Sequence, residues 1–355
     1  MRFPRIKTFI VISILLLTGL LLAGCWEDFP LEPPATPTAE GETGWFEVYF
    51  TDPSWPSLRG GPDARLAEAI AQARLSVDIA AYDLDLWSLR DALLEAHQRG
   101  LSVRMVTESD YLDSPEIQEL KEAGIPLLGD RREGLMHNKF VVIDRQEVWT
   151  GSMNFTLNGA YRNDENLVRV RSTRLAENYT REFEEMFVQD AFGPGSPADT
   201  PYPTLTVEGT LLEVYFSPED GAASRLVELI GGAQHSLHFL VYSFTSDEIA
   251  AALIASHQAG LEVRGVLDAG QAESNTGGEY ENLRQAGLDV RLDGNRNRMH
   301  HKLLIIDEAI VVTGSYNFSF SAENRNDENT LVIHNPEIAA RFIAEFERVS
   351  ALAQP

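Results

Sequence analysis

The stretch MHNKFVVIDRQEVWTGSMN, residues 136–154, returns in the second part of the chain as MHHKLLIIDEAIVVTGSYN, residues 299–317. Both copies follow the pattern H-x-K-x4-D-x6-G-S-x-N, and 9 of the 18 positions from the motif His to the motif Asn are identical without a gap. The match continues into RNDEN, which occurs at residues 162–166 and again at residues 325–329. The chain therefore carries a long internal duplication.

Each copy of the motif contributes one histidine, one lysine and several short polar side chains. These residues are His137, Lys139, Asp144, Gly151, Ser152 and Asn154 in the first copy, and His300, Lys302, Asp307, Gly314, Ser315 and Asn317 in the second. Cationic and polar groups of this kind suit an anionic, oxygen-rich substrate. The duplication suggests two half-sites that meet to form one phosphate-handling centre.

The doubled motif resembles the signature of the phospholipase D superfamily of phosphodiesterases, over nearly all of the mature chain. The resemblance implies an α/β fold of two similar α/β/α sandwich halves related by a pseudo-two-fold axis. It also implies hydrolysis of a phosphodiester through a phosphohistidine, with no cofactor. Such chemistry requires a nucleophile, an acid for the leaving oxygen, and cations around the other phosphate oxygens.

By this resemblance His137 is the nucleophile and His300 the general acid and base, although the residues themselves do not rank the two. Six further side chains would hold the non-bridging oxygens or assist in doing so: Lys139, Lys302, Asn154, Asn317, Ser152 and Ser315. Glu165 and Glu328, in the repeated RNDEN, would bond the other ring nitrogen of a catalytic histidine and fix its tautomer.

Three further motif positions are expected to have no catalytic role. Asp144 and Asp307 each follow four consecutive apolar residues, which favours a structural role at a strand end. His301 corresponds to Asn138 in the first copy and has no further Cys, Asp or Glu at ligand spacing, so we interpret it as a variable position. The sequence predicts no metal site.

The duplication extends upstream of the motifs, where matching segments keep nearly the same separation along the chain. Helical periodicity over residues 64–74 and 86–99 alternates with short apolar runs such as 140–143 and 303–306, which are typical of buried strands. We predict a first half at 45–192, a linker at 193–207 rich in Pro, Gly and Thr, and a second half at 208–355.

The N-terminus resembles a bacterial lipoprotein signal. Three basic residues precede an uncharged, mostly apolar run that ends in Leu-Ala-Gly-Cys, with Cys25 as the only cysteine. We expect a signal peptide at 1–24, lipidation of Cys25 and a disordered linker at 25–44. This places a lipid-anchored enzyme in the bacterial cell envelope, outside the cytoplasm. The alternative is an uncleaved membrane anchor.

The formal net charge is −25, and loss of the signal segment leaves 26 basic and 54 acidic residues, a net charge of −28. Such a surface repels nucleic acid and anionic membranes at long range. Arginines nevertheless concentrate beside both motifs, which suggests a mouth that attracts anions. They are Arg131, Arg132, Arg162, Arg291, Arg296, Arg298 and Arg325.

Three functions remain open. The first is hydrolysis of phospholipid head-group esters to phosphatidate, which membrane tethering favours. The second is an extracytoplasmic nuclease of the same superfamily that cleaves DNA or RNA. The third is a noncatalytic phosphate-binding module of the envelope. In each case we expect a monomer.

Overall fold

The computed structural model describes residues 44–354. The predicted signal peptide, Cys25 and the linker up to residue 43 lie outside the described residues. Within the described part, no helix is both long and apolar enough to cross a bilayer.

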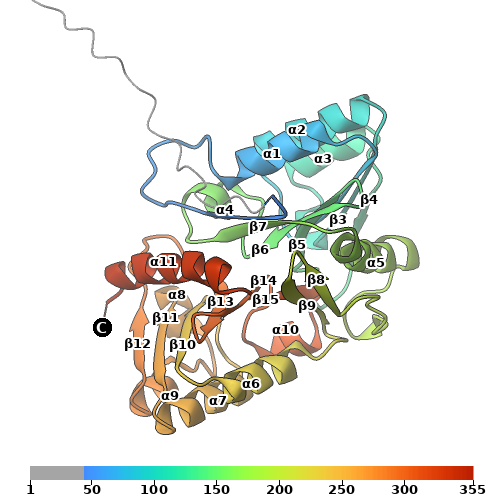
Figure 1. Cartoon of the computed structure of the whole chain (residues 1–355). Helices are drawn as coiled ribbons and strands as arrows, with labels where there is room; N and C mark the ends of the chain where they lie inside the picture. Colours follow the sequence, from blue (N-terminus) through green and yellow to red (C-terminus); the bar gives the residue numbers. More distant parts are fainter. Residues whose placement is uncertain (1–43, 355) are drawn as a thin grey trace, which may run out of the picture. The chain divides into compact units, whose positions relative to one another are not determined.

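The first half contains one seven-stranded sheet with helices on both faces (Figure 1). Its strands are β1 (Phe46–Phe50), β2 (Ser76–Ala81), β3 (Ser102–Thr107), β4 (Leu127–Gly129), β5 (Lys139–Ile143), β6 (Glu147–Gly151) and β7 (Asn166–Arg171). Its helices are α1 (Pro62–Gln72), α2 (Trp87–Gln98), α3 (Pro115–Glu122), α4 (Leu157–Tyr161) and α5 (Thr173–Gln189), with short 3-10 turns η1 (Ser109–Tyr111) and η2 (Gly193–Gly195). The strand order is β1-β7-β6-β5-β2-β3-β4.

The second half repeats this arrangement and adds one edge strand. Its strands are β8 (Thr204–Val207), β9 (Thr210–Ser217), β10 (Ser236–Val241), β11 (Glu262–Leu267), β12 (Asp289–Leu292), β13 (Lys302–Ile306), β14 (Ile310–Gly314) and β15 (Glu328–His334). Its helices are α6 (Ala222–Gly232), α7 (Asp247–Gln258), α8 (Ala269–Ser274), α9 (Tyr280–Gln285), α10 (Phe320–Asn324) and α11 (Pro336–Leu352). The order β12-β11-β10-β13-β14-β15-β9 matches the first sheet strand for strand, and β8 extends it.

The apolar motif runs form the central strands of the two sheets. Every residue of β5 and of β13 is buried, as expected for strands that are covered on both faces. Both strands pair with antiparallel neighbours, β5 with β2 and β6, and β13 with β10 and β14. The prediction of buried strands in both copies is confirmed, and so is the α/β class with two similar halves.

One hydrophobic core joins the two halves, and each half has a second core on its outer side. Helices α5 and α11 lie on the inner faces of the sheets, whereas α1–α3 and α6, α7 and α9 cover the outer faces (Figure 1). In the shared core, Tyr179 of α5 makes edge contacts with Phe140 and Phe216, with ring centroids 5.0 and 5.2 Å apart. Aromatic pairs of this geometry each add about 0.5–1.5 kcal/mol beyond the burial of area. Because Phe140 and Phe216 belong to different halves, these contacts hold the halves together.

The segment 193–207, predicted as a linker, is not irregular throughout. Its last four residues form β8, which pairs antiparallel with β9. Leu205 is buried, while Thr204 and Thr206 on either side of it are exposed. This period of two is a strand signal, and the Pro-rich composition of the preceding residues obscured it.

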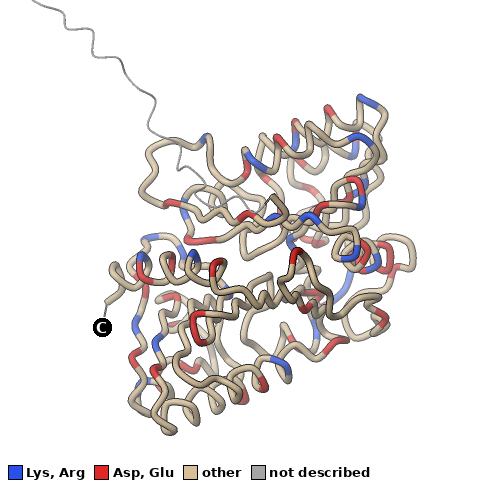
Figure 2. Tube along the Cα trace, viewed as in Figure 1, with Lys and Arg blue, Asp and Glu red and all other residues tan. Residues whose placement is uncertain are grey.

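Acidic residues are spread over both halves of the described chain (Figure 2). The surface is therefore acidic on each half, as the composition predicts.

Candidate active site

The two motif histidines lie at the ends of β5 and β13 and are held by the opposite half of the chain. The backbone N–H of His137 donates to the carbonyl of Asp327 at 3.0 Å, and that of His300 donates to the carbonyl of Asp164 at 2.9 Å. Short parallel bridges accompany these bonds, one at Met136 with Asp327 and the other at Met299 with Asp164. Each H-x-K segment is therefore paired with the RNDEN segment of the other half.

The imidazoles follow the same crossed arrangement. Nδ1 of His137 lies 2.7 and 2.9 Å from the two carboxylate oxygens of Glu328, 191 positions along the chain. Nδ1 of His300 lies 2.8 Å from Oε1 of Glu165, an ion-pair distance whose angle is not that of a hydrogen bond. All four side chains are buried. The acidic partner of each histidine thus comes from the other half, and the pair at His137 is the better formed.

The two motif lysines are buried beside the histidines. Nζ of Lys139 donates to the carbonyl oxygen of His137 at 2.6 Å. Nζ of Lys302 donates to the carbonyl oxygen of His300 at 2.8 Å and lies 3.1 Å from Nε2 of the same ring. Each ammonium group is therefore fixed next to the motif histidine of its own half.

Two tyrosines that the sequence analysis did not single out complete the walls of the site. The ring of Tyr82 lies 4.9 Å from that of His137, and the ring of Tyr242 lies 4.4 Å from that of His300. Nζ of the motif lysines lies 5.1 Å from the centroid of Tyr82 and 4.9 Å from that of Tyr242. A signal was available in the sequence, because both tyrosines occupy the same place in the repeat, directly after a repeated strand.

The two half-sites are electrostatically coupled. Burial lowers the pKa of His137 to about 4, against the attraction of Glu328. The pKa of His300 lies well below its usual range because of burial and then of Lys302, Lys139 and His137. Burial also lowers the pKa of Lys139 to about 7 and that of Lys302 to about 8. Burial therefore favours the neutral form of both rings, and the pKa of each is lowered further by the lysine of the other half.

The motif Gly-Ser pair connects β6 and β14 to the crossed segments. At Gly151 φ is +149°, and a Cβ there would lie 2.4 Å from the carbonyl oxygen of Asn166, so the position requires glycine. The hydroxyl oxygen of Ser152 accepts from the backbone N–H of Asn166 at 3.0 Å, and that of Ser315 accepts from Asn329 at 3.0 Å. The structure places both predicted substrate-binding serines at these strand ends, where they position the segment that carries the glutamates.

The motif asparagines have an unpaired side-chain oxygen in each half. Oδ1 of Asn154 and Oδ1 of Asn317 are buried and have no hydrogen-bond partner within residues 44–354. An unpaired buried polar atom costs about 1–3 kcal/mol, and such atoms are often kept for a functional reason. Each motif asparagine therefore has a free acceptor at the same place in the repeat.

His301, interpreted as a variable position, has a structural role that the sequence did not indicate. His301 is fully buried, its Nδ1 lies 3.0 Å from Nδ2 of Asn166, and its Nε2 lies 3.0 Å from Glu345. Its counterpart Asn138 accepts through Oδ1 from Nδ2 of Asn329 at 2.9 Å. Different residues thus make the same bridge between the halves in the two copies, which an alignment of the two motifs shows only as a mismatch.

The structural role predicted for the motif aspartates is confirmed. Asp144 accepts hydrogen bonds from the backbone N–H groups of residues 74–76, and Asp307 accepts them from residues 234–236. Each aspartate therefore ties the end of the strand after the His-Lys pair to the chain that enters the neighbouring strand.

Some of the arginines expected to attract anions to the motifs are paired with acidic residues instead. Arg131 pairs with Asp190 at 2.6 Å, and Arg291 pairs with Asp289 at 3.1 Å. Arg298 instead lies 5.6 Å over the ring of Tyr242 and contributes to the lowered pKa values of His300 and Lys302. Arg298 is therefore the arginine of the set that acts on the centre.

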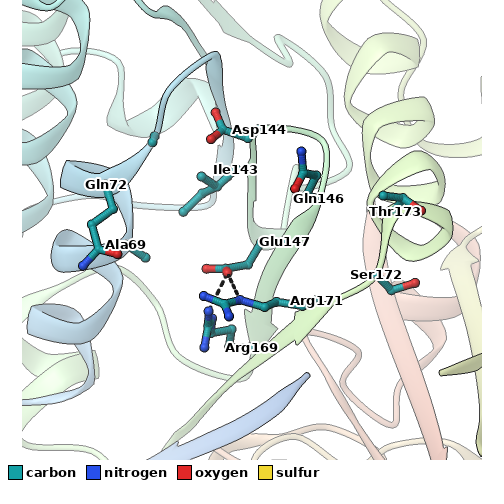
Figure 3. A pocket seen from close by; sticks show the side chains of 11 residues that line it. Ala69, Gln72, Ile143, Asp144, Gln146, Glu147, Arg169, Arg171, Ser172 and Thr173 are labelled. Atoms are coloured by element: carbon teal, nitrogen blue, oxygen red, sulfur yellow. Dashed lines mark hydrogen bonds and ion pairs between the residues drawn. The ribbon is translucent and has the colours of Figure 1, made fainter. Parts of the chain in front are cut away.

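A hollow of about 460 Å³ lies elsewhere, between α1, the turn from β5 to β6, β7 and the start of α5 (Figure 3). It contains none of the predicted catalytic residues. Three of its charged side chains pair with one another: Glu147 accepts from Arg169 at 2.7 Å and from Arg171 at 3.0 Å. We assign it no role in catalysis.

Comparison with known proteins gives matches in both halves of the chain. The model of a family described as cardiolipin synthase, PLD-like domain, matches residues 66–187 and again residues 226–350, together more than half of the chain. Curated relatives include the mitochondrial cardiolipin hydrolase of Homo sapiens, 36% identical over 37% of this chain, and a phospholipase D of Rickettsia prowazekii, 34% identical over 36% of it. The chain spans 51% and 62% of the length of these two relatives.

A solved structure covers most of the fold. The phosphatidylserine synthase of Haemophilus influenzae Rd KW20 matches with a TM-score of 0.65 at 15% identity, over 86% of each chain. At that identity the likeness concerns the fold alone. The doubled motif, the paired sheets and the match of the family model to both halves lead to one conclusion: the chain belongs to the phospholipase D superfamily.

Proposed function

We propose that this protein is a phosphodiesterase that hydrolyses phospholipid head-group esters to phosphatidate through a phosphohistidine, without a metal in the chemical step. One observation carries the proposal. Two His-Lys pairs from opposite halves share one electrostatic centre, and the imidazole of each lies against a glutamate of the other half. This arrangement offers one ring for attack, another for proton transfer, and two cations for the phosphate.

In the first step Nε2 of His137 attacks phosphorus and forms an N–P bond. The contact between Nδ1 and Glu328 favours the tautomer with its proton on Nδ1, which leaves the lone pair of Nε2 free. The P–O bond to the head group breaks, and the leaving oxygen takes a proton from Nε2 of His300. Lys139 and Lys302 stabilise the charge on the non-bridging oxygens.

In the second step His300 removes a proton from water, and the water oxygen attacks phosphorus. The N–P bond breaks, phosphatidate leaves, and His137 returns to its neutral form. His300 must be the doubly protonated imidazolium when the substrate is bound. An anionic phosphate favours this form, because negative charge beside the ring raises its pKa. Lys302, 3.1 Å from Nε2 of His300, turns to a phosphate oxygen at the same time.

The assignment of His137 as the nucleophile rests on the unequal surroundings of the two rings. Lys302 contacts Nε2 of His300, whereas the hydrogen bond of Lys139 within the described residues goes to the main chain of His137. Nδ1 of His137 also has the better formed carboxylate contact. A ring with a free Nε2 and a carboxylate partner at Nδ1 is suited to attack and to carry the positive charge of the phosphoimidazole.

Three observations support a lipid substrate. Curated relatives are named cardiolipin hydrolase and phospholipase D. The acidic chain, with a net charge of −25, disfavours nucleic acid. Phe320, in the helix that follows Asn317, is 60% exposed, and Arg325 lies 5.5 Å over its ring. An exposed aromatic ring with a cation suits the interface of a bilayer, although the same ring would also stack on a base.

We also propose that the protein is anchored to a membrane of the bacterial cell envelope through lipid on Cys25. The support is the sequence Leu-Ala-Gly-Cys after a short apolar run with basic residues before it. An anchored enzyme meets phospholipid at high local concentration, which fits the proposed substrate.

The test compares the full-length protein on phosphatidylcholine, cardiolipin and plasmid DNA. We expect release of phosphatidate from phospholipid, lost in His137→Ala and in His300→Ala. His257→Ala, on α7 and away from the motif, serves as the matched control and should keep the wild-type rate. Cleavage of DNA without release of phosphatidate would establish the nuclease, and no turnover of any substrate would leave the noncatalytic module.

A further inference from the structure

Three glutamates gather beside the shared core, outside the catalytic centre. Glu182 and Glu185 belong to α5, and Glu219 follows β9. Each offers one carboxylate oxygen, and these oxygens all lie within 4.8 Å of one another. Glu182 and Glu185 are 3% and 2% exposed, and Glu219 is half-buried. Three carboxylates from both halves of the chain therefore converge at one buried point.

None of the three glutamates forms an ion pair within residues 44–354, although Arg181, which pairs with Asp199, attracts Glu185 electrostatically. No Lys, Arg or His of this part of the chain lies at ion-pair distance from any of the three, whereas the buried Glu345 of α11 pairs with both His301 and Arg348. Oε1 of Glu185 and Oε2 of Glu219 are buried without a hydrogen-bond partner there. Buried carboxylates in this state require a counter-charge or protons.

The second half shows what occupies the equivalent place. The alignment that relates the two motifs also relates α5 to α11 without a gap, so Glu182 corresponds to Glu345 and Glu185 to Arg348. The guanidinium of Arg348 lies 2.7 Å from Glu345 and 2.5 Å from Asp164. One half thus has a built-in cation between its buried carboxylates, where the other half has a further glutamate.

We propose that Glu182, Glu185 and Glu219 bind one divalent cation with a preference for oxygen ligands, Ca²⁺ in the first place. The ion supplies beside Glu182 the positive charge that Arg348 supplies beside Glu345 in the second half. It neutralises the carboxylates that the fold brings together there.

The donor set selects this class of ion. Carboxylate oxygens without Cys or His suit Ca²⁺ and Mg²⁺ rather than softer metals. Ca²⁺ binds oxygens at about 2.3–2.6 Å, so two of its ligands lie at most about 5 Å apart. The 4.8 Å limit among the three oxygens meets this requirement without rearrangement of the backbone. Mg²⁺ needs a tighter octahedron and is the weaker fit.

The site is linked to the contact between the halves. Oε1 of Glu182 accepts from Nδ2 of Asn138 at 3.1 Å, and Asn138 accepts from Asn329 of the other half at 2.9 Å. A cation here fixes Glu182 and, through Asn138, the chain between His137 and Lys139. Its role is to stabilise the contact between the halves, and it takes no part in the bond-breaking steps.

The test measures Ca²⁺ binding to the full-length protein after removal of metal with EDTA, at pH 7.5 and constant ionic strength. We expect one site by isothermal titration calorimetry and a rise in Tm of about 3–6 °C at saturating Ca²⁺. Glu185→Arg copies the arrangement of the second half, so it should raise Tm in EDTA and abolish both the binding heat and the Tm response. Glu228→Gln, which removes a 68% exposed carboxylate of α6, is the matched control and should respond as the wild type does.

A reciprocal variant keeps the test decisive if one substitution fails to fold. Arg348→Glu places a third carboxylate beside Glu345 and Asp164 and should create a second Ca²⁺ response. The proposal is overturned if the wild-type protein gives no binding heat and no Tm shift with Ca²⁺ or Mg²⁺. In that case protons shared among the three glutamates neutralise them. A Ca²⁺ response of equal size in Glu185→Arg and in the wild type would overturn it as well.

Discussion

The crossed pairing of histidines and glutamates can be tested by double-mutant cycles on stability. Nδ1 of His137 donates to the buried carboxylate of Glu328 at 2.7 Å, and a hydrogen bond to a charged group contributes about 1.5–3 kcal/mol. His137→Ala leaves that carboxylate without its donor, whereas Glu328→Gln removes its charge. We therefore expect the double variant to be less destabilised than the sum of the single variants, by about 1.5–3 kcal/mol.

The control for this cycle is Glu165, the glutamate in the same half of the chain as His137. Glu165 lies against His300 rather than His137, so His137→Ala and Glu165→Gln should be additive to within about 0.5 kcal/mol. Free energies of unfolding from urea titration at pH 7 provide all the values, and unchanged m-values would show that the denatured state is comparable. Equal coupling of His137 to both glutamates, or stronger coupling to Glu165, would refute the crossed arrangement.

Four further predictions concern the chemistry, the buried charge and the anchor. His137→Ala and His300→Ala should each lose nearly all turnover, by more than about 10²-fold. Only His300→Ala should trap a phosphoenzyme, with phosphate on His137, when the leaving group of the substrate needs little protonation. A rate of half the wild-type value in each variant would mean two independent sites. Initial rates at room temperature should survive excess EDTA, because two lysines supply the positive charge at the phosphate; loss of activity that one divalent ion restores would contradict this. Lys139→Met should gain about 1–2 kcal/mol of stability below pH 7. The gain should fade as pH rises from about 7, the lowered pKa of Lys139 in the folded protein, towards 10.5, its pKa in the unfolded chain, because burying the lysine costs less as the unfolded chain also loses its proton. Urea titration across this pH range measures the gain, and a gain independent of pH would argue against a buried charge. Cys25→Ser should abolish acyl labelling and processing before Cys25, and equal labelling of both proteins would exclude the lipoprotein.

Much of the protein could be predicted from the repeat. A motif that returns in constant register, with strand periodicity on both sides, carries local information, and local information is what a sequence displays directly. The family, the α/β class, the buried motif strands and the strand-end role of Asp144 and Asp307 all follow from it. The strand β8 was missed because the Pro-rich composition next to it outweighed a short alternation of buried and exposed residues.

The contacts between the halves were decided by tertiary structure. Glu328 pairs with His137 across 191 positions rather than with the histidine of its own copy, and no spacing within one copy shows this. His301 and Asn138 look like a mismatch in the alignment, yet both bridge the halves. A duplicated sequence determines each half separately, whereas the packing of two sheets about a shared core determines which side chains meet, because those contacts depend on the orientation of one half against the other.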